Sequence, residues 1–245
     1  MNADTLITVH GYAGDAHQMA DLMPWYLHHQ CPVAIITPTD APVNALRGAN
    51  ELVSYHHFGL KGYIGQVSLD RQWGQMKYLV DNFPHKYFLM NDSDSVCLIP
   101  ELPRYLYETP TVIWSNEVIE PRPHPSIYPK IAMQPPYFMT RENILKLLSV
   151  PREKTLAHPI TPFIDYYMLN VAEEAKIVHL SFPNGQSNGT GDAHGQHYMA
   201  LKIAQEKKVF VHSIKSLDIM KRILRAADVS TSGRKVVFVT RPRGT

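Results

Sequence analysis

The chain has 245 residues, 44% of them hydrophobic and 19% charged, and this balance excludes a wholly disordered protein. Its 24 Lys and Arg against 22 Asp and Glu leave a net charge of +2, which neither indicates a nucleic-acid-binding protein nor excludes one with a local basic face. The two cysteines, Cys31 and Cys97, exclude a disulfide-rich scaffold.

The N-terminal residues 1–5 contain no basic segment followed by a long apolar stretch, so we expect no secretory signal. No apolar run in the sequence approaches the ~20 residues that a transmembrane helix needs, so we expect no membrane anchor. Together these observations predict a cytoplasmic protein.

Strands and helices alternate through the first half of the sequence. Short apolar runs that end in turn residues predict buried strands at residues 6–9, 33–37, 87–90 and 111–114. Apolar residues at helical spacing predict helices at residues 16–29, 68–82 and 99–107. Because strand and helix alternate, we expect an α/β fold with a mostly parallel central sheet flanked by helices.

The second half changes in composition before the alternation resumes. Residues 117–136 are rich in proline and predict a long ordered loop, whereas residues 183–195 are rich in Gly, Asn and Ser and predict a lid that orders over a ligand. Helices are predicted at residues 140–148, 164–175, 200–205 and 217–227, and strands at residues 209–211 and 236–239. The length favours one domain over two.

Two motifs lack the partners that their chemistry needs. Residues 10–14, HGYAG, follow the first strand as the oxyanion loop of an α/β-hydrolase does. The chain contains no G-x-S-x-G to supply the nucleophile, so a serine hydrolase is not predicted. His194 and His197 have the spacing of a helical metal pair, but no third ligand lies nearby in the sequence, so we predict no independent zinc site there.

The acidic tripeptide Asp92-Ser93-Asp94 directly follows a predicted buried strand. Two carboxylates at this spacing on a turn can bind one divalent cation, which keeps open positions for diphosphate oxygens. Its position favours this interpretation, because ligands of open α/β sheets bind at the carboxyl ends of strands. The alternative is an ordinary turn, since Asp and Ser are common turn formers.

This strand and acidic turn, YFLMNDSD at residues 87–94, resemble the D-x-D segment of GT-A type glycosyltransferases. Three later segments are similar to family segments in the same order: QPPYFMTR at residues 134–141 to the acceptor side, PFID at residues 162–165 to the segment of the catalytic base, and VHSIK at residues 211–215 to the late His and Lys. The resemblance covers most of residues 5–220 as an order of elements.

The resemblance implies a single GT-A-like (Rossmann-like) domain over residues 1–245. Residues 1–115 would form the nucleotide-sugar-binding half, and residues 116–245 the acceptor-side half with a C-terminal tail. It also implies transfer of a glycosyl group from a nucleoside diphosphate sugar to an acceptor hydroxyl, with Mn²⁺ or Mg²⁺ stabilising the leaving diphosphate. Retention and inversion at the sugar both stay open.

The resemblance assigns a role to individual residues. The expected metal ligands are Asp92, Asp94 and His212, and the expected catalytic base is Asp165. Contacts with the nucleotide sugar are expected from Thr8, His10, Tyr12, Arg71, Asp92, Ser93 and Lys215. Structural alternatives stay open, among them a helix cap for Asp165 and a solvated surface position for Arg71 and Lys215.

Two acceptors and one different class of function remain open. One acceptor is a hydroxymethylated pyrimidine in double-stranded bacteriophage DNA, which basic residues of the C-terminal third could contact through phosphates and aromatic residues at 55–58 and 166–167 by stacking. The other is a bacterial surface polysaccharide or another glycan. Either enzyme would act in the cytoplasm of a bacterium or a phage-infected host. The remaining class is a non-catalytic α/β module that binds nucleotides or nucleic acids.

Overall fold

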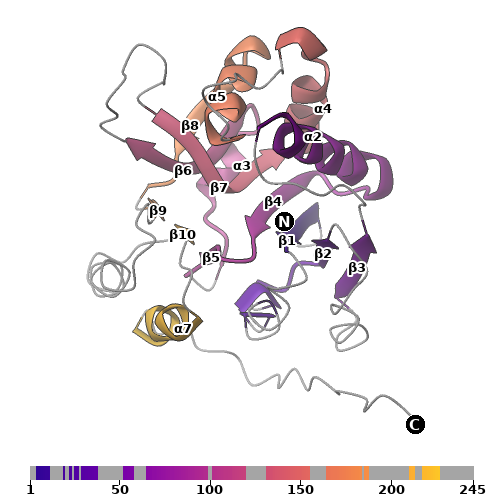
Figure 1. Cartoon of the computed structure of the whole chain (residues 1–245). Helices are drawn as coiled ribbons and strands as arrows, with labels where there is room; N and C mark the ends of the chain where they lie inside the picture. Colours follow the sequence, from indigo (N-terminus) through magenta and orange to yellow (C-terminus); the bar gives the residue numbers. More distant parts are fainter. Residues whose placement is uncertain are drawn as a thin grey trace.

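The computed structural model of the protein describes residues 4–11, 19, 22–23, 25–27, 29–37, 52–57, 65–98, 101–119, 131–154, 164–183, 185–187, 210–212 and 217–226. This part of the chain contains a seven-stranded sheet, a three-stranded sheet and the helices around them (Figure 1). None of its helices has the length and apolar character to cross a membrane.

The central sheet has the strand order β3-β2-β1-β4-β7-β6-β8. Its strands are β1 (Thr5–His10), β2 (Val33–Thr37), β3 (Val53–His57), β4 (Tyr87–Asp92), β6 (Val112–Ile119), β7 (Ile131–Thr140) and β8 (Val178–Ser181). All neighbouring strands are parallel except β7, which is antiparallel to both β4 and β6. The predicted α/β fold with a mostly parallel sheet is confirmed.

The central strands are apolar on both faces because helices cover both faces. On one face, side chains such as Leu6 and Phe88 pack against α2 (Gly65–Asn82), α4 (Arg141–Leu148) and α5 (Ile164–Glu174). Figure 1 shows these three helices gathered on one side of the sheet. On the other face, Ile7 and Leu89 belong to a second cluster that includes Tyr26. Side chains thus alternate between two cores along each strand.

A second, three-stranded sheet lies beside the first and is not predicted by the sequence. Its order is β5 (Val96–Cys97), β10 (Phe210–His212) and β9 (Gly185–Ser187), with β10 antiparallel to β5 and parallel to β9. Because β5 begins two residues after Asp94, this sheet brings residues 210–212 next to the acidic turn. The remaining described elements are α3 (Tyr105–Glu108), η4 (Arg152–Lys154) and α7 (Leu217–Ala226).

Several elements differ from the sequence-based expectation. Residues 117–119 and 131–136, which we predict as loop, belong to β6 and β7. Pro135 and Pro136 fall where the β6–β7 register shifts, and a proline at such an irregularity removes no ladder hydrogen bond. The helix predicted at residues 99–107 is reduced to the four residues of α3, because the prolines at positions 100 and 103 lack the N–H that a helix interior needs.

The two edge strands, β3 and β8, are also absent from the prediction. Both are short and partly polar, and in β8 the apolar side chains are the exposed ones: Val178 is 58% and Leu180 40% exposed. The pattern of a buried strand is therefore missing from both segments. The predicted helix at residues 200–205 and the strand at 236–239 lie outside the described residues.

The C-terminal end of α2 is capped by a residue from another element. The last turn of α2 contains no basic residue, and the carbonyl oxygens at a helix end need donors. Arg141, the first residue of α4, donates from Nη1 to the carbonyl oxygen of Phe83 at 2.7 Å and from Nη2 to that of Val80. Its positive charge also opposes the negative end of the helix dipole. This contact ties α2 to the end of β7.

We therefore expect Arg141→Met to lower the free energy of unfolding by about 1–3 kcal/mol, because it leaves two helix-end carbonyls without a charged donor. Urea denaturation followed by circular dichroism measures this change. The matched control is Arg104→Met, since the Arg104 pair with Glu108 is exposed and 3.7 Å long, and should change stability little. Equal stability of the two variants would contradict the capping role.

Candidate active site

The acidic turn lies at the carboxyl edge of the sheet, beside the end of β1. Asp92 pairs in register with His10, and the backbone N–H of Ser93 donates to the carbonyl oxygen of His10 at 3.0 Å. The N–H of Ser95 then donates to the carbonyl oxygen of Asp92 at 3.0 Å, which closes a four-residue β-turn. The turn is thus held in a defined position at the edge where open α/β sheets bind their ligands.

One of the two carboxylates of this turn is almost completely buried. Asp94 is 5% exposed, and Asp92 is partly buried. A carboxylate removed from water requires hydrogen bonds or a cation nearby. Two such oxygen ligands on one turn fit a divalent cation of the Mg²⁺ or Mn²⁺ type. Among the residues that the structure describes, no group of three His, Cys, Asp or Glu side chains could hold a metal ion, so a third protein ligand would come from elsewhere.

The structure brings the backbone of His212 to this turn. Val211 of β10 pairs with Val96 of β5, and the two strands are antiparallel. His212 is therefore one residue farther along the ladder, toward Ser95 and the acidic turn. Its side chain is not among those described, so its role as a metal ligand stays a prediction.

A buried neutral histidine and a partly buried arginine lie in the electrostatic field of the turn. His10 is 8% exposed, and its Nε2 is 3.0 Å from Thr8 Oγ1. Burial lowers the pKa of His10 to about 4; Asp92 opposes this shift and Arg71 adds to it. The pKa of Arg71 is also lowered by burial and raised by Asp92. At neutral pH the site therefore combines a neutral imidazole, a guanidinium and carboxylates.

The glycine that follows His10 packs closely against Met19. Its backbone N–H donates to the carbonyl oxygen of Ile36 at 3.2 Å. A Cβ atom at position 11 would lie 2.2 Å from the Sδ atom of Met19, which is fully buried. A larger residue at position 11 would therefore force the end of the flexible Met19 side chain to move.

Of the predicted site residues, the structure gathers Thr8, His10, Arg71, Asp92, Ser93 and Asp94 at one edge of the sheet. Asp165 lies in the first turn of α5, and its side chain is not described; Tyr12 and Lys215 lie outside the described residues.

Two residues that support the turn were not predicted from the sequence. Tyr26 donates from its hydroxyl to the carbonyl oxygen of Ser95, and Asn91 donates from Nδ2 to the carbonyl oxygens of Thr8 and Leu89. The bonds from Tyr26 to Ser95 and from Asn91 to Thr8 join different elements. They depend on the tertiary fold, and no local sequence pattern predicts them.

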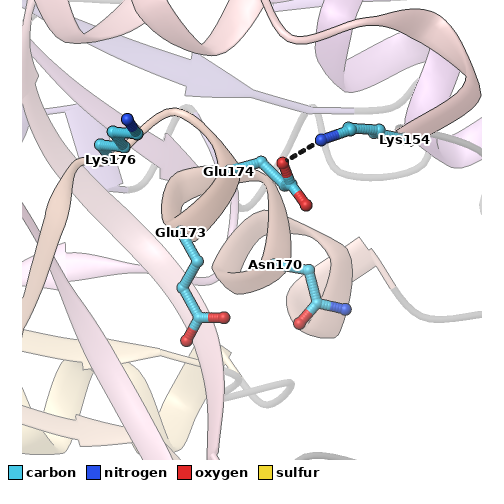
Figure 2. A pocket seen from close by; sticks show the side chains of 5 residues that line it. All are labelled: Lys154, Asn170, Glu173, Glu174 and Lys176. Carbon is cyan, nitrogen blue, oxygen red and sulfur yellow. Dashed lines mark hydrogen bonds and ion pairs between the residues drawn. The ribbon is translucent and has the colours of Figure 1, made fainter.

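An open depression of about 530 Å³ lies elsewhere on the molecule (Figure 2). Its lining consists of Lys154, Asn170, Glu173, Glu174 and Lys176, and Lys154 pairs with Glu174. All five side chains are exposed, and none is aromatic. The depression adjoins the C-terminal end of α5, which leads into the start of β8, whereas the acidic turn lies at the carboxyl edge. It is therefore not part of the candidate site.

Comparison with known proteins identifies the fold. The sequence matches no protein-family model and no curated protein. The structure is similar to that of galactosyltransferase LgtC in complex with donor and acceptor sugar analogs: sequence identity is 10%, the TM-score is 0.53, and the match covers 94% of this chain and 98% of that chain. It is also similar to the apo form of glycosyltransferase GlyE from Streptococcus pneumoniae TIGR4, with 13% identity, a TM-score of 0.55 and coverage of 94% of this chain and 62% of that chain.

The chain therefore has the GT-A fold, which confirms the fold that the resemblance of its motifs implies. In this fold the acidic turn of residues 92–94 occupies the end of β4, at the centre of the carboxyl edge.

The lowered pKa of His10 predicts that the metal-free protein loses stability as the pH falls from about 6.5 toward 4. The unfolded chain takes up a proton at the ordinary pKa of 6.5, whereas the folded state resists it until about 4. The stabilisation is present above pH 6.5 and amounts to at most about 3 kcal/mol. Denaturant unfolding across this pH range, with wild type and His10→Asn compared, isolates the contribution. Parallel pH curves for the two proteins would contradict it.

Proposed function

We propose that the protein is a glycosyltransferase that takes its sugar from a nucleoside diphosphate donor. The observation that carries this proposal is the acidic turn, with Asp94 buried, at the carboxyl end of the central strand of a GT-A fold. The similar structures include a galactosyltransferase with donor and acceptor sugar analogs bound.

The residues at the edge suit a nucleoside diphosphate. The guanidinium of Arg71 interacts electrostatically with Asp92 and so belongs to this edge. It would neutralise phosphate oxygens of the donor by charge-assisted hydrogen bonds. The neutral imidazole of His10 would offer its Nδ1, which has no hydrogen-bond partner among the described residues, to a polar group of the donor. Thr8 fixes the imidazole from the other side. Tyr12, Ser93 and Lys215 complete the proposed donor contacts.

A divalent cation, Mn²⁺ or Mg²⁺, would stabilise the charge on the leaving diphosphate. Asp92 and Asp94 would hold it, and the pairing of β10 with β5, which brings the backbone of His212 close to the turn, supports His212 as a further ligand. An imidazole ligand favours Mn²⁺ over Mg²⁺.

Asp165 is the proposed catalytic base. Helix α5 ends shortly before β8 begins, so its C-terminal end lies near the amino end of that strand. The helix has 11 residues and is about 16 Å long, and Asp165 lies in its first turn, at the end away from β8. A carboxylate near the acceptor hydroxyl would remove its proton as the glycosyl bond forms.

The acceptor is a hydroxyl group, and we propose two sources for it. A hydroxymethylated pyrimidine in double-stranded DNA would meet basic side chains such as Arg222, which is exposed on α7. A surface polysaccharide would instead be recognised by hydrogen bonds from the edge of the sheet.

Donor binding tests the proposal. We expect a uridine or other nucleoside diphosphate sugar to raise the melting temperature in the presence of Mn²⁺, by a stabilisation of about 2.7 kcal/mol at a ligand concentration of 100 times Kd. Asp94→Asn should abolish the Mn²⁺-dependent part of the rise. The matched control, Asp81→Asn, removes an exposed carboxylate paired with Lys77 on α2 and should behave as wild type. If no nucleotide sugar stabilises the wild type, the donor site is wrong; if binding occurs without turnover, the non-catalytic module is favoured.

Substitution of the base separates chemistry from binding. We expect Asp165→Asn to lower kcat by about 10²–10⁴-fold while the donor Kd stays unchanged, since a general base acts on the acceptor proton alone. Glu173→Gln, an exposed position at the other end of the same helix, is the control. The assay offers hydroxymethylated duplex DNA and polysaccharide in parallel, and the acceptor that is glycosylated identifies the class. An unchanged kcat in Asp165→Asn would remove this residue from the mechanism.

A further inference from the structure

The acidic turn is bonded to the side chain of Tyr26. Tyr26 is 3% exposed and packs in the apolar cluster that also contains Cys97 and Leu98. Its hydroxyl donates to the carbonyl oxygen of Ser95 at 2.8 Å. The bond joins residues 69 positions apart in sequence, so it constrains the turn through the tertiary fold.

Ser95 is the junction between the two halves of the proposed metal site. Its N–H closes the turn on Asp92, and the next residue begins β5, which pairs with β10. The position of Ser95 therefore sets the separation between the acidic turn and His212. The Ser95 hydroxyl has no hydrogen-bond partner among the described residues. The Ser95 carbonyl oxygen, in contrast, accepts the hydrogen bond from Tyr26, and this bond holds the residue in place.

The phenol is suited to remain a donor in this environment. Burial raises its pKa, and the carboxylates of Asp94 and Asp92 raise it further. A protonated phenol donates without adding negative charge beside the two carboxylates. Loss of the hydroxyl would leave the buried Ser95 carbonyl oxygen without this donor. Because an unsatisfied buried carbonyl costs free energy, the backbone around Ser95 would tend to rearrange.

We propose that Tyr26 is a positioning residue whose hydroxyl, by holding Ser95, fixes the spacing of Asp92, Asp94 and His212 that a divalent cation and a nucleoside diphosphate require. The role in ligand binding rests on the proposed function; the role in holding the turn does not. In this proposal Tyr26, which is buried, acts through Ser95 and not by contact with the donor.

The test compares Tyr26→Phe with Tyr107→Phe. Both variants keep an aromatic ring in the same cluster and delete one hydroxyl, but Tyr107 is bonded to Thr5 Oγ1 at 3.1 Å, at the amino end of β1, away from the turn. The first measurement is amide hydrogen exchange of Ser93 and Ser95 in the metal-free protein. We expect exchange about tenfold faster in Tyr26→Phe and unchanged in Tyr107→Phe. Equal exchange in both variants would overturn the anchoring role.

The second measurement is the affinity for Mn²⁺ alone, by electron paramagnetic resonance, followed by steady-state kinetics. We expect Tyr26→Phe to weaken Mn²⁺ binding and to raise KM for the donor by about tenfold, with a smaller effect on kcat, while Tyr107→Phe matches wild type. Faster exchange with unchanged Mn²⁺ affinity would overturn the link to ligand binding. If the wild type binds neither Mn²⁺ nor nucleotide sugar, the proposed function fails, and the exchange measurement still decides whether Tyr26 holds the turn.

Discussion

The burial of a carboxylate at the end of β4 is the constraint on which the rest of the site depends. Asp94 is removed from water, and such a group needs compensation from its surroundings. The guanidinium of Arg71 interacts electrostatically with Asp92 and balances part of this negative charge, while backbone hydrogen bonds fix the position of the turn. His10 does not add a second positive charge, because the burial that surrounds it outweighs the attraction of Asp92. Carboxylates, a guanidinium and a neutral imidazole are thus held close together at this edge, which is the arrangement from which the proposed donor site is argued.

Positions far apart in the sequence meet at this edge because of strand order. The parallel pairing of β1 with β4 places the end of the first strand next to the acidic turn, and the antiparallel β7 closes the other side of β4. The small sheet then adds β10 beside β5. The two sheets have separate hydrogen-bond ladders, and the turn between β4 and β5 is one of the short covalent links that join them. A shift of one residue at that link would move His212 away from the carboxylates.

The sequence predicted what local pattern can specify. Strands β1, β2 and β4 are buried on both faces and are mainly apolar in sequence, so all three were predicted. The position of the acidic turn was predicted with them, because it directly follows β4. The edge strands were not, because β8 exposes its apolar side chains and β3 is largely polar. The proline-rich segment contains parts of two long strands that its composition does not predict, and Pro135 and Pro136 lie at a register shift between them. The bond from Tyr26 to Ser95 could not be predicted at all, because it joins two elements that only the fold brings together.

The exposed strand β8 has a consequence for the solution behaviour of the protein. Of the described strands it pairs only with β6, so its outer backbone groups face away from the sheet, next to the apolar side chains of Val178 and Leu180. An edge of this kind is a template for pairing with a second molecule. Two features limit it: Lys176 adopts a φ of 55° just before the strand, and Pro183 follows it. They restrict the open edge to a strand of four residues. An edge this short can form few backbone hydrogen bonds with a second molecule, which disfavours self-association.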